Sequence, residues 1–170
     1  MIIAAFAGTG KTALARMYPQ KAVDFVSMPY KYYLKETGDN ARPSEDEACK
    51  ADFNNIMRED WPDNYVAAII ESMRAGKILL IPSAWNVLAK LKAKTIPYYL
   101  CYPRRDSKEI YEKRFLDRGN TEDFIDIFIG GWDGFMDTLE GDTYGRHVVM
   151  LPHQYLSDVI DIDTIFARGW

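Results

Sequence analysis

Ala5-Phe6-Ala7-Gly8-Thr9-Gly10-Lys11-Thr12 carries the strongest fold signal in this sequence. It overlaps the end of an apolar run, residues 2–6. The small residues Ala7, Gly8 and Gly10 let the backbone curl until successive N–H groups point into one concavity. Helix-forming residues follow the stretch, so the concavity opens at a helix N-terminus, where the peptide dipoles attract anions. The pattern predicts a phosphate-binding loop between a strand and a helix, and we call residues 5–12 the phosphate loop.

The side chains at the end of the phosphate loop have separate expected roles. Lys11 places a mobile positive charge on the β- and γ-phosphates of a nucleotide, and the Thr12 hydroxyl is a ligand for Mg²⁺. The loop departs from the strict pattern G-x-x-x-x-G-K-[ST] only at its first position, where Ala5 stands for glycine. The alternative interpretation is a glycine-rich turn that opens an ordinary helix. The candidate nucleotide-binding residues of the loop are Ala7, Gly8, Thr9, Gly10, Lys11 and Thr12.

Composition bounds the remaining interpretation. The chain has 170 residues, 48% of them hydrophobic and 14% aromatic, which suits one domain, 1–170, with one good core. The formal net charge of -4 argues against nucleic acid as a partner. Cys49 and Cys101 lie far apart without metal-ligand spacing, which argues against a zinc site or a disulfide framework.

The start of the chain and its hydropathy bear on localisation. The first expected strand begins at residue 2, which leaves no room for a signal peptide, and no apolar run approaches the ~20 residues of a membrane span. We expect a cytoplasmic protein that has reduced thiols and no membrane partner. A homo-oligomer is compatible with this sequence.

Strands and helices alternate along the chain. The run Ile78–Ile81 is apolar without alternation, as is typical of a strand covered on both faces in a parallel sheet. Ser44 followed by Glu47 resembles a capping box that opens a helix, and the polar segment 35–43 before it is expected to be an exposed loop. The expected strands are 2–6, 22–26, 77–82, 97–102 and 147–151, and the expected helices are 12–17, 44–58, 62–74, 85–94, 107–118, 121–139 and 156–166. This alternation predicts a three-layer α/β/α sandwich around a five-stranded parallel sheet.

Positive charge gathers after the fourth expected strand. Six cations lie within positions 104–118 of a chain that is acidic overall. Arg114 and Arg118 are four residues apart and share one face of a helix, so both could reach a transferring phosphoryl group. The alternative is a solvated helix on which Glu109, Glu112 and Asp117 pair with these cations.

Acidic residues are sparse at the expected ligand edge of the sheet. Asp24 ends the second strand, where it could accept the proton of an acceptor hydroxyl or hold Mg²⁺ through water, or could only terminate the strand. The third strand ends in Ser83, which is a poor metal ligand. That departure argues against motor-type and AAA-type ATPases, which need a carboxylate there.

The segment between the second and third strands of the sheet is the candidate acceptor side. Aromatic residues there could stack on a base, and Arg58 could clamp an acceptor phosphate. The alternative is that the tyrosines pack against the sheet edge. The candidate acceptor-binding residues are Tyr30, Lys31 and Arg58. His147 and His153 are assigned to structure, because no acid or nucleophile lies at a telling distance from either.

With these motifs in place, the chain resembles the P-loop small-molecule kinases, above all the nucleoside and nucleotide monophosphate kinases. It also looks like phage-encoded P-loop proteins of similar length, in which a comparable run to Tyr102-Pro103-Arg104-Arg105 leads into stretches like 111–115 and 118–120. The resemblance implies the P-loop NTPase fold with sheet order 2-3-1-4-5, a lid at about 103–120 and an acceptor-side insertion at about 27–61. It implies ATP and Mg²⁺ as cofactors, with Arg104 and Arg105 on the nucleotide and Lys11, Asp24, Arg114 and Arg118 in catalysis.

The function expected from this resemblance is transfer of the γ-phosphoryl of ATP to a nucleoside, nucleotide or similar small acceptor. The alternative is a non-catalytic or weakly hydrolytic nucleotide-binding module that acts through a protein or nucleic-acid partner. The missing third-strand carboxylate keeps that alternative open.

Overall fold

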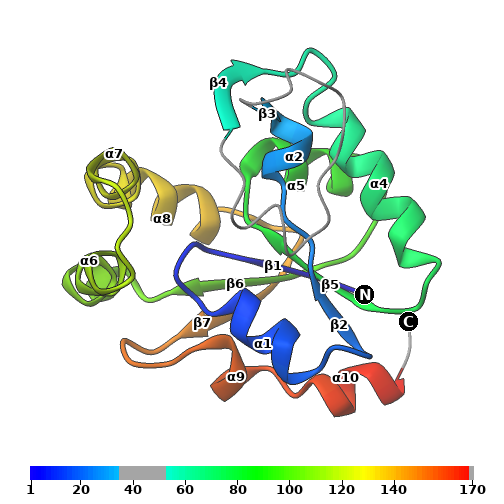
Figure 1. Ribbon diagram of the computed structural model, residues 1–170. Helices are drawn as coiled ribbons and strands as arrows, with labels where there is room; N and C mark the ends of the chain where they lie inside the picture. The colour runs from blue at the N-terminus through cyan, green and yellow to red at the C-terminus, as the bar shows by residue number, and fades with distance from the viewer. Residues whose placement is uncertain (35–52, 169–170) are drawn as a thin grey trace.

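A five-stranded parallel sheet forms the centre of the computed structural model, which describes residues 1–34 and 53–168 (Figure 1). The strands lie in the order β2-β5-β1-β6-β7, which is 2-3-1-4-5 when the strands of this sheet are numbered along the chain. The predicted parallel sheet and its order are therefore confirmed. The strands are β1 Ile2–Ala5, β2 Ala22–Asp24, β5 Ile78–Pro82, β6 Tyr99–Pro103 and β7 Arg146–Met150.

Helices cover both faces of this sheet, which makes the expected three layers (Figure 1). Successive side chains of β1 point to opposite faces, so Ile2 and Ala4 enter one core and Ile3 and Ala5 enter the other. The first core includes residues from α4 Asp63–Met73, α5 Trp85–Ala93, α6 Lys108–Asp117 and α8 Trp132–Glu140. The second includes residues from α1 Lys11–Met17, α9 Leu156–Val159 and α10 Ile162–Arg168. No helix in these two described ranges is both long and apolar enough to cross a membrane.

The single helix expected at 121–139 is instead three segments. They are α7 Glu122–Ile125, a π-helical turn η2 Asp126–Gly130, and α8. A wider π turn rotates the residues that follow it, and here Phe128, Trp132 and Phe135 all contact the ring of Phe6, with centroids 5.5–5.7 Å apart. Aromatic packing under the phosphate loop therefore overrides the regular helical pattern.

The expected closing helix, 156–166, is also broken. Ile160 is extended and buried, and Asp161 then starts α10 by accepting the Thr164 N–H at its Oδ1, 3.0 Å away. A short 3₁₀ turn, η1 Arg105–Ser107, precedes α6.

The acceptor-side segment differs from its sequence prediction. The helix predicted at 44–58 is wrong for its last part, because Phe53–Met57 is a strand, β4, that pairs antiparallel with β3 Tyr32–Leu34. Asparagine has a low helix propensity, and this segment carries two asparagines. Pairing with β3 satisfies the backbone groups of the segment in place of a helix. Residues 44–52 and the predicted loop 35–43 lie outside the described residues. A short helix, α2 Met28–Lys31, follows β2 and was not expected.

Candidate phosphate-binding site

The phosphate loop lies between β1 and α1, at the carboxyl edge of the sheet (Figure 1). Gly8 has φ +76° and Gly10 has φ +94°, left-handed values that favour glycine. Thr9 between them is fully buried, and its Oγ1 donates to the Phe6 carbonyl at 2.7 Å. The loop then enters α1 through the Gly10 carbonyl, which accepts the Leu14 N–H at 3.0 Å.

The backbone donors of this loop are free. Within residues 1–34 and 53–168, the N–H groups of Ala7, Gly8, Thr9 and Gly10 donate no hydrogen bond to the protein. Thr9 is buried, and Ala7, Gly8 and Gly10 are half-buried. Four successive N–H groups of this kind, placed before a helix N-terminus, can donate to an anion.

Lys11 lies folded back on the phosphate loop. Its Nζ donates to the carbonyls of Ala5 at 3.0 Å and Phe6 at 3.2 Å. Burial lowers the pKa of Lys11 to about 8, Asp24 opposes that shift, and the charge of Arg118 adds to it. Asp24 therefore offsets only part of the effect of burial on the Lys11 ammonium. A polyanion beside the ammonium would favour its charged form.

Asp24 and Thr12 meet at the first turn of α1. The Thr12 Oγ1 donates to the Asp24 Oδ2 at 2.5 Å, which joins α1 to the carboxyl end of β2. Asp24 is thus near both Thr12 and the Lys11 ammonium. These three side chains, predicted from separate parts of the sequence, are brought together by the fold.

Ser83 occupies the position after β5. Its N–H donates to the Ala5 carbonyl at 3.2 Å, so this turn sits beside the start of the phosphate loop without supplying a carboxylate. Across the described part of the chain, no three His, Cys, Asp or Glu side chains gather in a way that could hold a metal ion. A cation at this edge would depend on Thr12, Asp24, phosphate oxygens and water.

Arg114 of α6 and Arg118, the C-cap residue of that helix, have different surroundings. Arg118, next to the end of the helix, is exposed, and its side chain has no hydrogen bond or ion pair among the described residues. Its charge nevertheless reaches Lys11. Arg114 is 8% exposed and donates to the carbonyls of Gly8, Pro152 and Gln154.

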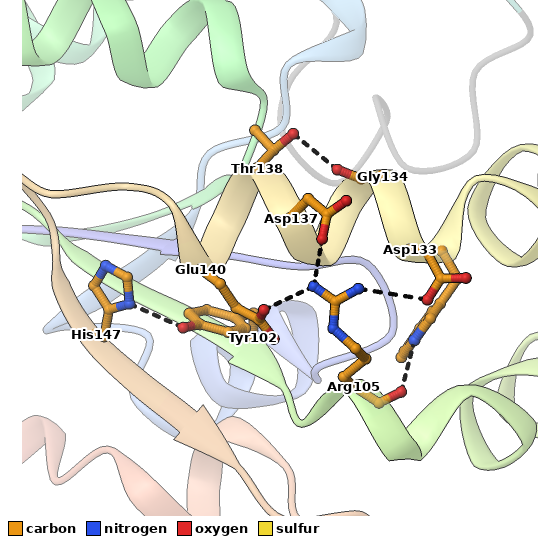
Figure 2. Close-up of polar contacts among 9 residues, drawn as sticks. Tyr102, Arg105, Asp133, Gly134, Asp137, Thr138, Glu140 and His147 are labelled. Carbon is orange, nitrogen blue, oxygen red and sulfur yellow. Dashed lines mark hydrogen bonds and ion pairs between the residues drawn. The ribbon is translucent and has the colours of Figure 1, made fainter.

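Arg104 and Arg105 are engaged by carboxylates. Arg104 pairs with Asp106 two residues on. Figure 2 shows the Arg105 guanidinium among carboxylates of α8, with Oδ1 of Asp137 2.6 Å and Oε2 of Glu140 2.7 Å away. The side chains of Arg104 and Arg105 are 51% and 39% exposed, so these ion pairs lie at the surface. In this arrangement neither guanidinium contacts the phosphate loop.

His147 lies in a structural network, as the sequence suggested. Its Nδ1 is 2.9 Å from the hydroxyl of Tyr102, and its Nε2 is 2.6 Å from the carbonyl of Asp142 (Figure 2 shows the Tyr102 contact). The Asp142 carboxylate also accepts the Tyr98 hydroxyl at 2.6 Å. These bonds fix the turn that leads into β7.

The three candidate acceptor residues lie around α2 and the small β3–β4 sheet. The Tyr30 ring lies 5.1 Å from that of Tyr65 and packs in an aromatic cluster. Lys31 places its Nζ 5.0 Å from the ring centroid of Tyr32, and Arg58, 8% exposed, donates its Nε to the Tyr32 carbonyl at 3.3 Å. The fold therefore groups Lys31 and Arg58 at the same short strand.

Residues of the C-terminal part that the sequence did not single out also touch the phosphate loop. The Leu156 N–H donates to the Thr9 carbonyl at 2.9 Å, and the Tyr155 ring lies against Gly10. On the other side, Tyr111 and Phe115 pack against Gly8. No local pattern marks these residues, because each contact joins positions that are far apart in the sequence.

No family model matches the chain, and no curated protein matches it. Among solved structures, a gluconokinase from Sinorhizobium meliloti 1021 is similar, with a TM-score of 0.47 and 17% sequence identity over 98% of this chain and 90% of that chain. The order of the five parallel strands described above is the one that the resemblance of the sequence implied.

Proposed function

We propose that this chain is a phosphotransferase that binds ATP at the phosphate loop and moves its γ-phosphoryl to a small acceptor such as a nucleoside or nucleotide. The observation that carries the proposal is the row of four backbone N–H groups, Ala7 to Gly10, which have no partner in residues 1–34 and 53–168. Donors of this kind at a helix N-terminus bind phosphate oxygens, and Lys11 adds a positive charge beside them.

The donor set at the start of α1 suits Mg²⁺. A hydroxyl and a carboxylate are the oxygen ligands that this ion prefers, and it commonly takes only one or two protein ligands besides phosphates and waters. Because the Thr12 proton is donated to Asp24, the lone pairs of the Thr12 oxygen remain available to a cation. When bound, Mg²⁺ would offset the charge of the phosphate oxygens. Thr12 would hold it directly, and Asp24 would orient the Thr12 hydroxyl and hold a water.

Arg118 is the group that we assign to the transferring phosphoryl. Its side chain is exposed and unpaired among the described residues, and its charge is close enough to lower the pKa of Lys11. Phosphoryl transfer passes through a loose transition state with negative charge on the equatorial oxygens, so fixed positive charge there lowers the barrier.

Ser83 favours transfer over hydrolysis. An ATPase needs a group that holds the metal firmly and orients the attacking water, and the turn after β5 offers only a hydroxyl. A kinase instead needs an acceptor held in line with the γ-phosphoryl. We propose that Lys31 and Arg58 face an anionic part of that acceptor, and that Tyr30 supports them through its aromatic packing.

The direct test is ATP turnover by the full chain with Mg²⁺, alone and with a panel of nucleosides and nucleoside monophosphates. The proposal predicts slow ADP release alone and marked stimulation by one class of acceptor. Tight ATP binding without stimulation by any acceptor would favour the nucleotide-binding module.

Arg118→Ala tests the transition-state assignment. Loss of one group that stabilises transition-state charge costs about 10²–10³-fold in kcat, so kcat should fall while the affinity for ATP changes little. Lys113→Ala is the matched control, because Lys113 lies on the same helix and pairs at 3.4 Å with Asp117 on the exposed surface. Equal losses in kcat and affinity would make Arg118 a simple binding group.

A further inference from the structure

The phosphate loop does not hold its shape alone. Segment 152–156, which connects β7 to α9, lies against it on one side. The Leu156 N–H donates to the Thr9 carbonyl at 2.9 Å, and a Cβ on Gly10 would lie 3.3 Å from Cδ1 of Tyr155. The loop therefore touches a part of the chain about 145 residues further on.

Arg114 links that segment to the loop. Its Nη2 donates to the carbonyls of Pro152 at 3.2 Å and Gln154 at 3.0 Å, and its Nη1 reaches the Gly8 carbonyl at 3.5 Å. Its guanidinium carbon also lies 4.6 Å from the ring centroid of Tyr111 and 4.0 Å from that of Tyr155. The guanidinium is thus held by aromatic rings and three backbone carbonyls, with 8% of the residue exposed.

These contacts bear on the direction of the free N–H groups. In a trans peptide unit the C=O and the following N–H point in opposite directions. Arg114 holds the Gly8 carbonyl and Leu156 holds the Thr9 carbonyl, so the N–H groups of Thr9 and Gly10 are fixed on the other side of their peptide planes. Both N–H groups belong to the row that lacks a partner in the described part of the chain.

The same contacts oppose any movement of the Arg114 side chain. A buried charge loses its hydration, which only close polar partners offset. Reaching a phosphoryl group would break the bonds to the carbonyls of Pro152 and Gln154 and leave the Gly8 carbonyl without its donor. The sequence alone could not distinguish Arg114 from Arg118, which has none of these bonds.

We infer that Arg114 is a positioning residue that clamps segment 152–156 onto the phosphate loop and orients the Gly8–Thr9 and Thr9–Gly10 peptides for phosphate binding. This inference rests on the proposed function of the loop. It gives Arg114 a role in the affinity for every ligand with a polyphosphate chain, rather than contact with the transferring phosphoryl group.

The experiment measures the affinities of ADP, ATP and inorganic tripolyphosphate for the wild type, Arg114→Ala, Arg114→Lys and Arg118→Ala. Arg114→Ala should weaken all three ligands by a common factor of about tenfold, since one charge-assisted contact contributes ~1.5 kcal/mol. The loss should appear more in the KM for ATP than in kcat. Millimolar guanidinium ion added to Arg114→Ala should restore part of the tripolyphosphate affinity, whereas Arg114→Lys, without the planar fork, should not.

Several outcomes would overturn the inference. Unchanged ADP and tripolyphosphate affinity with a lower kcat would place Arg114 on the transferring phosphoryl. A lower melting temperature with unchanged affinities would make it a structural residue only. Absence of ADP, ATP and tripolyphosphate binding by the wild type would instead defeat the proposed function itself.

A second pair of variants keeps the test open if Arg114→Ala does not fold. Tyr155→Phe keeps the ring over the guanidinium, and Tyr155→Leu removes it. Tyr155→Leu should weaken tripolyphosphate binding more than Tyr155→Phe does. Equal affinities for the two would contradict the clamp.

Discussion

The hydroxyl of Thr12 donates a hydrogen bond of 2.5 Å to the carboxylate of Asp24. It joins the first turn of α1 to the last residue of β2, two elements that flank the phosphate loop. Because the Thr12 hydroxyl donates its hydrogen to the Asp24 carboxylate, the lone pairs of the Thr12 oxygen stay available to a hard cation. The role that we propose for Asp24 is to orient the Thr12 hydroxyl and to hold a water on the cation.

Asp24→Asn should lower the affinity for ATP in the presence of Mg²⁺ by about tenfold, the loss expected for one charge-assisted contact of ~1.5 kcal/mol. With EDTA in place of Mg²⁺, ATP should bind the variant as well as the wild type or better, because a negative charge near the phosphates is gone. Titration calorimetry under both conditions measures the difference. An equal loss with and without Mg²⁺ would show that Asp24 supports the loop rather than the metal.

Lys11 should make nucleotide binding depend on pH. Burial lowers its pKa from 10.5 to about 8, so above pH 8 the free protein holds it increasingly neutral, whereas bound polyphosphate favours the charged form. ATP affinity should therefore fall as the pH rises from 8 to about 10, with proton uptake on binding. Calorimetry at pH 8.5 in buffers of different ionisation enthalpy measures that uptake.

The matched control is Lys11→Arg, which stays protonated and should bind ATP without proton uptake. The lowered pKa of Lys11 also makes the free energy of unfolding depend on pH. Between pH 8 and 10.5 the unfolded chain binds more protons at Lys11 than the folded protein does. The contribution of Lys11 to the free energy of unfolding therefore rises with pH across that window. Proton uptake of equal size in Lys11→Arg would assign it to another group.

Gly8→Ala should destabilise the fold and weaken nucleotide binding. At Gly8 a Cβ would lie 2.7 Å from Cε1 of Phe115, and the φ of +76° adds strain. Gly119→Ala is the matched control, since its φ of +71° is similar but its Cβ would meet nothing within 4 Å. Both variants bear about 1 kcal/mol of backbone strain, and Gly8→Ala should cost a further 1–3 kcal/mol through overpacking. Equal losses in urea unfolding would show that Phe115 does not limit the loop.

Tyr111→Phe should keep or raise stability, although Tyr111 is fully buried. By its geometry the Tyr111 hydroxyl forms no hydrogen bond among the described residues. Burial raises its pKa to about 12, and the nearby Arg114 guanidinium opposes that shift. Removing an unsatisfied buried hydroxyl relieves a cost of roughly 1 kcal/mol, and the ring that faces Arg114 remains. A loss of more than about 1 kcal/mol in urea unfolding would reveal a partner for the hydroxyl.

Much of the fold could be predicted from the sequence because its signals are local. The apolar run at Ile78–Ile81 and the glycines of the phosphate loop fix their own conformations, and both lie where they were expected. The breaks in the two long C-terminal helices could not be predicted, because contacts with Phe6 and burial of Ile160 decide them. Strand β4 was missed for the same reason, since the residues that it pairs with in β3 lie 19 to 25 positions earlier in the sequence.

In the candidate site, too, local signals could be predicted from the sequence and long-range contacts could not. Lys11, Thr12 and Asp24 could be proposed from motif and strand position, and the fold brings them together. The different surroundings of Arg114 and Arg118 could not be inferred from their four-residue spacing, because segment 152–156 supplies the partners of Arg114. The roles of all five residues stay predictions that the experiments above address.

The most direct test of the account is the change in melting temperature caused by Mg²⁺ and ATP in the wild type and in Lys11→Ala. At an ATP concentration a hundredfold above the dissociation constant, ligand linkage stabilises the wild type by about 2.7 kcal/mol, or roughly 5–10 °C for a chain of this size. We predict that shift for the wild type and for the surface control Lys113→Ala, and its loss in Lys11→Ala. A shift of equal size in Lys11→Ala, or none in the wild type, would contradict nucleotide binding at the phosphate loop.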